Sequence, residues 1–300
     1  MKRVVAAVVF FVSIFTISAQ TTLSFNPEKG AKYEYHTEMV QNIKTTVMGQ
    51  EVPAEIKMDM MYLMEVKDKS EQESTVQFTF SEIAYIVSSL YMKMEFDSKN
   101  PNESPSDIDL MLSKMFKEML GKSFTAVINT DGSVESVSGM EAIGESMTNA
   151  IARDGQMIAQ LGAHMKEQFN DAAMKNMFET SFKVYPANPV RTGNSWDIEN
   201  AVTMNNLNVM YKSKYTLRSV SRNVATVAVD TKIEMNPEAG IVEGSNISGT
   251  QTGTLTIDTR TGMILTGNVT ANMKGAMRTS GMDVQMVLDT KTKTSTKMIE

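Results

Sequence analysis

The feature that most constrains the fold is a series of strand-like segments that fills the last third of the chain. Their apolar and polar residues alternate with period two, the pattern of a strand that buries one face. Turns separate the segments, and no helical pattern occurs between them, so we expect antiparallel β-structure. The expected strands are residues 197–206, 208–219, 223–235, 247–258, 263–275 and 281–296.

Residues 31–98 show the same pattern near the start of the chain. Residues 57–66 place apolar side chains on one face, and residues 75–80 continue with β-branched and aromatic residues. The polar segment 67–72 between them predicts a turn, so these two runs should pair as a hairpin. Residues 91–96 alternate again, and a loop rich in Pro, Asn and Ser then ends this sheet region.

Two segments between these strand regions have helical periodicity. In residues 107–120 the apolar positions recur at intervals of three and four; Ser106 or Asp107 can cap the start, and Gly121 can cap the end. Residues 141–182 repeat apolar positions every four residues, with interruptions at a glycine and at an Asn-Asp pair. We therefore expect two or three shorter helices there.

A hairpin is predicted between the two helical segments. The sequence Asn129-Thr-Asp-Gly132 separates two alternating runs, residues 124–128 and 133–137. An Asp-Gly pair between alternating runs is a strong signal for a tight β-turn.

Residues 186–196 interrupt regular structure, because two prolines and a glycine fall within this short stretch. We interpret the segment as a connector. It divides the chain into an N-terminal half with helical insertions, residues 20–185, and a C-terminal half, residues 197–300, and we expect the halves to form one body.

The two halves echo each other in pattern. Residues 62–83 read as strand, polar turn and strand, and residues 215–233 repeat this order. Residues 124–135 and 253–264 form a second such pair. The pattern indicates a pseudo-duplicated meander, although unrelated hairpins that share turn chemistry would look the same.

Together these elements predict an α+β protein that is predominantly antiparallel β. About twelve strands with one apolar face cannot remain a flat open sheet, so the sheet should be strongly curved or partly closed. The amphipathic helices of the first half should cover its concave face. We expect the last segment, residues 281–296, to form a sheet edge, where its lysines would discourage further pairing.

Methionine is unusually frequent, with 27 residues of 300. The methionines concentrate on the strand and helix faces that we expect to meet. Apolar stripes usually fill a core, but flexible thioether chains could also line a pocket that adapts to ligands. The candidate lining residues are Met58, Met60, Met64, Met92, Met94, Met111, Met115, Met119, Met147, Met157 and Met165.

The sequence offers little support for metal or catalytic chemistry. Met-x-Met pairs could hold Cu(I), but residues two apart on a strand share a face without any metal, and His36 and His164 stand alone. The chain has no cysteine, no Gly-x-Ser-x-Gly elbow, no Ser-x-x-Lys pair and no phosphate-binding loop. We predict no catalytic residue, no metal site and no cofactor. A hydrolase with carboxylates distant in sequence stays open, because their separation is spatial.

The first nineteen residues resemble a secretory signal peptide. Lys2 and Arg3 precede an apolar run, and Ile17-Ser-Ala19 provides a cleavage site after Ala19. The run is shorter than a membrane span, so no span is expected after its removal. A net charge of −6 argues against nucleic acid as a partner. We expect an exported protein in the periplasm or at the cell surface.

The chain resembles a family of exported Bacteroidota proteins that is classed as a domain of unknown function. The similar features are the signal peptide, the Pro186-x-x-Pro-Val-x-x-Gly-x-Ser-Trp196 stretch and the hairpin Leu255-Thr-Ile-Asp-x-x-Thr-Gly262. This resemblance implies no activity and no site residues. At the level of a curved sheet with covering helices, the chain is also similar to periplasmic lipoprotein carriers, which does not decide function.

These observations lead to three functional hypotheses. The first is a non-enzymatic envelope protein that binds an apolar or lipid-like ligand between sheet and helices. The second is a structural or partner-binding envelope protein with a filled core. The third is a hydrolase whose site the sequence does not reveal.

Overall fold

The computed structural model describes residues 20–152, 169–204, 207–236, 245–279 and 282–299. The predicted signal peptide and two candidate lining residues, Met157 and Met165, lie outside these ranges. Three helices are present in the described part: α1 (Asp107–Lys117), α2 (Met140–Ile151) and α4 (Asp171–Phe182).

The strands agree closely with the sequence pattern. The first half contributes six of them, and the alternation in β3 illustrates the cause: Val76, Phe78 and Phe80 are fully buried, whereas the residues between them are partly exposed. The strands of the first half are β1 (Lys32–Val47), β2 (Gln50–Lys69), β3 (Glu73–Ser89), β4 (Lys93–Asp97), β5 (Ser123–Asn129) and β6 (Val134–Ser138). Those of the second half are β7 (Ser195–Met204), β8 (Leu207–Ser221), β9 (Val224–Met235), β10 (Asn246–Asp258), β11 (Ile264–Thr279) and β12 (Met282–Met298).

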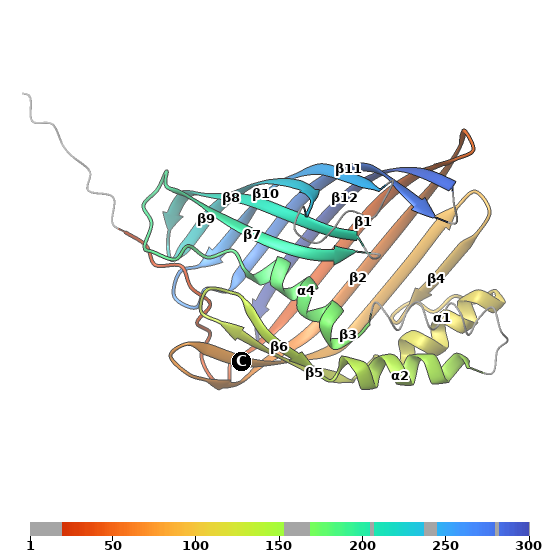
Figure 1. Cartoon of the computed structure of the whole chain (residues 1–300). Helices are drawn as coiled ribbons and strands as arrows, with labels where there is room; N and C mark the ends of the chain where they lie inside the picture. The colour runs from red at the N-terminus through yellow and green to blue at the C-terminus, as the bar shows by residue number, and fades with distance from the viewer. Residues whose placement is uncertain (1–19, 153–168, 205–206, 237–244, 280–281, 300) are drawn as a thin grey trace, which may run out of the picture.

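All strands belong to one antiparallel sheet, in which β1 pairs with β12 and so joins the two halves. The order is β6-β5-β3-β2-β1-β12-β11-β10-β9-β8-β7, with β4 added beside β3. The sheet is curved but not closed, since among the described residues its end strands β6 and β7 do not pair with each other (Figure 1). The proposed duplication stays a prediction, because strand order alone does not test it.

The expectation that the last strand forms an edge is wrong. β12 lies in the middle of the sheet, between β1 and β11. Its lysines are tolerated there because Lys291 and Lys293 are exposed on the outer face, while the alternating threonines Thr290, Thr292 and Thr294 face inward. Lysine discourages pairing with another strand only when it lies on a free edge. In β12 the lysines instead lie on a solvated face of the sheet.

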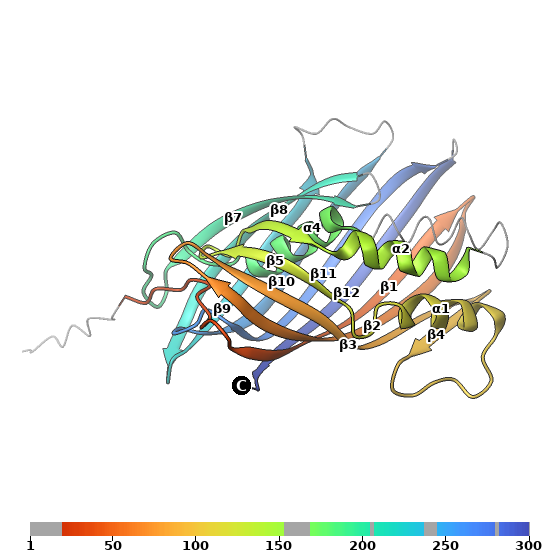
Figure 2. The same ribbon diagram turned by 90° about the horizontal axis from the view of Figure 1, so that it is seen from below.

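Helix α4 lies inside the curve of the sheet, between the two end strands (Figures 1 and 2). Its apolar side joins an aromatic cluster with strands of the first half. The ring centroid of Phe178 is 4.7 Å from that of Phe78, and Phe182 lies 5.6 Å from Phe25 and 5.9 Å from Tyr35. Such contacts bury large apolar surface and hold the helix to the sheet.

Helix α1 begins as the sequence predicts. The Ser106 side chain caps the Asp109 N–H, and the Asp109 carboxylate accepts from the Ser106 backbone in return, which forms a capping box. The helix ends at Lys117, three residues earlier than expected, and Gly121 follows with φ of +74°. Phe116 of α1 stacks on Phe96 of β4 at 5.4 Å.

Candidate functional site: a chamber beneath helix α4

A chamber lies between α4 and the inner face of the sheet. Its central part has a volume of about 460 Å³ and contacts strands of both halves. Two adjoining hollows of about 310 Å³ and 190 Å³ share lining residues with it, one on each side. The helix therefore covers a continuous space rather than packing directly onto the whole sheet.

One side of the chamber is apolar and rich in methionine. Met58 on β2 lies opposite Met39 on β1, and Met60 lies opposite Thr37. The Tyr62 hydroxyl donates a hydrogen bond to the Met60 sulfur at 3.2 Å, which fixes that thioether against the wall. The helix supplies Met177, whose side chain is 44% exposed.

Next to this wall, the inner face of β12 is polar but uncharged. Thr290, Thr292 and Thr294 occupy alternate positions of β12 and form a row of hydroxyls, which we call the threonine row. Gln41 on β1 donates from Nε2 to the Thr290 Oγ1 at 3.1 Å. Gln251 on β10 adds an amide nearby. Among the described residues, no Asp, Glu, Lys, Arg or His lines any of the three hollows.

The tyrosines of the chamber indicate a poorly solvated environment. Burial raises the pKa of the Tyr35 and Tyr62 hydroxyls above the ordinary tyrosine value, and it also raises the pKa of Tyr211. Desolvation of the charged form is the cause in each case. A site that disfavours a tyrosinate also disfavours other unpaired charges.

The structure places the predicted lining methionines in different environments. Met58 and Met60 line the chamber. Met64, Met111, Met115, Met119 and Met147 are buried in the core, and Met94 packs against that core. Met92 is 43% exposed in the turn between β3 and β4. Whether any of them contacts a ligand stays a prediction.

Sequence reasoning missed Met39, Met177 and the threonine row. The row had a readable signal, because Thr alternates with Lys or Ser through residues 290–297, which is the pattern of a strand with one polar inner face. That segment was interpreted as an edge, so its inward face was not considered. Met39 lies outside any methionine stripe, whereas Met177 forms a pair with Met174 at helical spacing that could have pointed to it.

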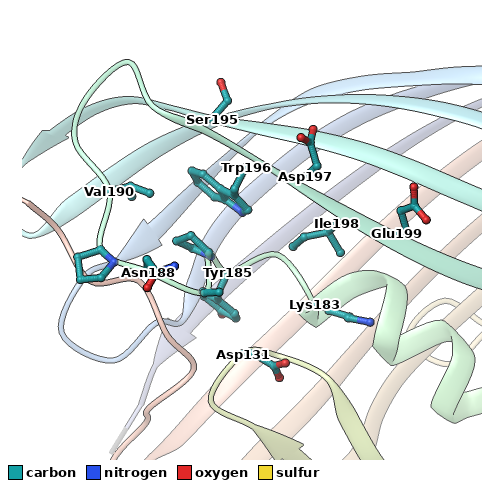
Figure 3. Close-up of a pocket in the computed structure, with 13 residues that line it drawn as sticks. Asp131, Lys183, Tyr185, Asn188, Val190, Ser195, Trp196, Asp197, Ile198 and Glu199 are labelled. Atoms are coloured by element: carbon teal, nitrogen blue, oxygen red, sulfur yellow. The ribbon is translucent and has the colours of Figure 1, made fainter.

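A second hollow, of about 520 Å³, lies on the outside of the molecule where the connector passes β7 (Figure 3). The Trp196 indole donates from Nε1 to the Val184 carbonyl at 3.0 Å, and its ring stacks on Tyr215 at 5.8 Å. These contacts hold the connector to the sheet, as expected for a structural joint.

The carboxylates around this outer hollow do not converge. Asp197 and Glu199 point away from Asp131, which lies across the hollow in the turn between β5 and β6 (Figure 3). The Asp131 Oδ1 accepts from the Ser133 N–H at 2.9 Å and stabilises that turn. Acid–base chemistry needs two groups that reach one reacting bond, and this arrangement lacks that geometry.

In the described part of the chain, no group of three His, Asp or Glu residues is placed to hold a metal ion. Over the same residues, no helix combines the length and the apolar character needed to cross a membrane.

Three solved structures show weak likeness to this fold. A lipovitellin structure described under lipid–protein interactions has a TM-score of 0.45 and 8% identity, over 91% of this chain and 25% of that chain. Pseudomonas aeruginosa OccK7 (OpdD) has a TM-score of 0.26 and 6% identity, over 90% of this chain and all of that chain. The translocator domain of the autotransporter NalP from Neisseria meningitidis has a TM-score of 0.22 and 6% identity, over 88% of each chain. This chain spans a quarter of the lipovitellin chain, and we base no argument on likenesses of this strength.

Comparison with curated proteins finds no match to this sequence. A family match covers residues 71–264 and extends from the first half, through the connector, into the hairpin between β10 and β11. Because this match includes more than half of the chain, the protein belongs to DUF6263, a family of unknown function.

Proposed function

We propose that this protein is a non-enzymatic, exported envelope protein that binds an apolar, lipid-like molecule in the chamber beneath α4. The observation that carries the proposal is the chamber itself. Its central volume of about 460 Å³ falls in the range of small-molecule sites. A well-packed core would leave few voids larger than a water molecule.

The lining supports an apolar ligand rather than water alone. Met39, Met58 and Met60 form one wall, and their unbranched thioethers can adapt to ligands of different shape. Phe178 on α4 and Tyr62 on β2 add aromatic surface to the lining. Contacts with this wall would remove hydrocarbon from water, which is the main source of affinity for such ligands.

We favour binding over hydrolysis because the carboxylates nearest to an open hollow point apart, as described for Asp131, Asp197 and Glu199. Export is proposed from residues 1–19 alone. It is tested by the mass of the mature protein recovered from cells, which should correspond to cleavage after Ala19. A mature protein that still begins at Met1 would contradict export by this route.

Two neighbouring alanines on α4 offer a matched test of the chamber. Ala173 lines the chamber, whereas its neighbour Ala172, about 100° away around the helix, is exposed and does not line the hollows. Ala173→Phe should fill the space and weaken binding of the fluorescent probe N-phenyl-1-naphthylamine by about tenfold or more, while Ala172→Phe should bind as wild type does. Native mass spectrometry and solvent extraction of the purified protein should also release a bound apolar molecule.

Absence of probe binding, together with an empty extract, would overturn the proposal. Equal binding by both phenylalanine variants would also do so, because the probe would then lie elsewhere. Circular dichroism spectra of the two variants control for unfolding.

One observation favours a partner-binding role as a second candidate. Leu90, Tyr91 and Met92 are consecutive in the turn between β3 and β4, and they are 66%, 80% and 43% exposed. Adjacent exposed apolar side chains often mark contact surfaces. Photo-crosslinking from position 91 in cells tests this candidate: one specific protein adduct supports it, and no adduct removes it.

A further inference from the structure

We infer that the chamber selects an uncharged amphiphile, with a hydroxyl or carbonyl head against the threonine row and a hydrocarbon tail against the methionines. This inference rests on the proposed function and adds the chemical class of the ligand. Long-chain alcohols, sterol-like molecules, ketones and neutral esters fit this class. Fatty acids, phospholipids with buried headgroups and alkylamines do not.

The register of the sheet sets the head and tail contacts side by side. Met58 on β2 lies opposite Met39 on β1, and Met39 lies opposite Thr292 on β12. Strands in a sheet are about 4.8 Å apart, so the hydroxyl of Thr292 and the thioether of Met58 are separated by roughly 10 Å across the wall. The change from apolar to polar lining therefore occurs over the length of one small amphiphile.

The threonine row has hydrogen-bonding capacity to offer. Each hydroxyl provides one donor and two acceptor positions, and Gln41 uses one acceptor position of Thr290. Thr292 and Thr294 are only partly buried, and both line two of the hollows. The Thr294 hydroxyl already hydrogen-bonds with the Tyr35 hydroxyl, so Thr292 is the better-placed contact for a ligand head. Gly267 lies opposite Thr294 on β11, and the Leu255 side chain approaches to 3.2 Å from where a Cβ of Gly267 would lie, so apolar surface adjoins this end of the row.

The described lining offers no charge complement to an ionic head. The three hollows lack charged lining residues among those described, so a buried carboxylate, phosphate or ammonium would have no counter-ion there. Taking an ion out of water without a partner costs more than hydrocarbon contacts return. The raised pKa of Tyr35 and Tyr62 agrees with this, because the same desolvation acts on their phenolates. A neutral head avoids the penalty and can still bond to the threonines.

A series of ten-carbon probes tests the inference on the purified mature protein at pH 7.5. Decanol, decanoate, decylamine and decane share one tail and differ only in the head. Displacement of N-phenyl-1-naphthylamine should show decanol binding about tenfold or more tightly than decanoate and decylamine, and several-fold more tightly than decane.

Isosteric variants locate the head. Thr292→Val combined with Thr294→Val removes two hydroxyls but keeps the shape of the wall. The affinity for decanol should therefore fall to that for decane, and the affinity for decane should not change. Thr254→Val is the matched control, since Thr254 is exposed on β10 and outside the hollows. Thr254→Val should leave the affinities for all four probes unchanged.

The outcomes separate the inference from the proposed function. Decanoate or decylamine binding as tightly as decanol would overturn the neutral-head inference and leave ligand binding intact, as would unchanged decanol affinity in the double variant. If none of the four probes displaces the fluorophore, the neutral-head inference is wrong. The proposed function is overturned separately, when the fluorophore itself does not bind and the extract is empty.

Discussion

The carboxylate of Glu179 on α4 accepts a hydrogen bond from the backbone N–H of Val134, the first residue of β6, with 2.6 Å between Oε2 and N. β6 is one of the two end strands and pairs with β5 on one side only. Glu179 takes the place of a neighbouring strand on the other side. The helix that covers the chamber therefore also protects the sheet edge beside it. Edge strands that are covered in this way resist pairing with other chains.

We predict that Glu179→Ala lowers the free energy of unfolding by about 1–3 kcal/mol, because a half-buried backbone donor loses its partner. Glu179 also forms an ion pair with Lys183 at 3.3 Å. Lys183→Ala removes only that pair and should cost less than about 1 kcal/mol. Urea unfolding of both variants measures the difference. Equal losses would show that the ion pair, and not the bond to β6, holds the helix.

Asp109 connects α1 to β4 and should make the protein sensitive to acid. Its Oδ1 accepts from the Glu95 N–H at 2.7 Å, and its Oδ2 accepts from the Ser106 N–H at 2.9 Å. Burial of Asp109 acts to raise its pKa, but the hydrogen bonds from Glu95 and Ser106 outweigh burial, and the pKa of the carboxyl is lowered. A lowered pKa stabilises the fold above the unfolded value of about 4, and this contribution is lost as pH falls through the folded pKa.

Urea unfolding between pH 2.5 and 6 tests this effect. Wild type should lose stability as the pH falls below about 4, and Asp109→Asn should be less stable at pH 7 with a flatter acid dependence. Asp107→Asn is the control, since Asp107 is an exposed neighbour in the same first turn. An acid profile of Asp109→Asn that parallels wild type would rule out this carboxylate as a source of the loss.

Tyr215 should produce the opposite behaviour at alkaline pH. Burial raises the pKa of its hydroxyl to about 12, and a hydrogen bond with Ser213 only partly offsets this. A raised pKa gives stability that is fully present below the unfolded value of about 10 and is lost as pH rises toward 12. Tyr215→Phe should therefore unfold with a smaller pH dependence between pH 9.5 and 11.5. A profile as steep as that of wild type would assign the alkaline loss to other groups.

The sequence predicted the elements well, but it did not predict their neighbours. Alternation depends only on which face is buried, and the strand bounds of the second half agree with the structure to within four residues. In the first half, β3 continues to Ser89, well past the expected run of residues 75–80, and β2 begins at Gln50, before the expected run of residues 57–66. The pairing of β1 with β12 joins residues near opposite ends of the chain, and no local pattern records it. The lysines of β12 were misread for this reason.

The candidate site was less predictable than the fold. Periodicity shows that Met60 and Met115 are both buried, but it cannot show that Met60 faces a chamber while Met115 lies in a filled core. That difference depends on the distance between α4 and the sheet. The distance is set by contacts such as Phe178 on Phe78, between residues a hundred positions apart.

Gly132 lies against the end of α4 with no room for a side chain. The sequence predicts Gly132 in the β5–β6 turn, and the structure confirms it with φ of +82°. A Cβ at this position would lie 2.0 Å from the carbonyl oxygen of Phe182, at the end of α4. Gly49, in the β1–β2 turn, has φ of +81° but no heavy atom within 4 Å of such a Cβ. The two glycines share a left-handed backbone conformation, but only Gly132 lacks room for a Cβ.

Gly49→Ala should cost about 1–2 kcal/mol, the usual cost of a left-handed backbone for alanine. Gly132→Ala should cost at least about twice as much, because the clash displaces Phe182 from the aromatic cluster under α4. Urea unfolding measures both values, and probe binding in the chamber should weaken only for Gly132→Ala. If both variants lose the same stability and bind the probe alike, the turn at Gly132 does not fix the position of α4.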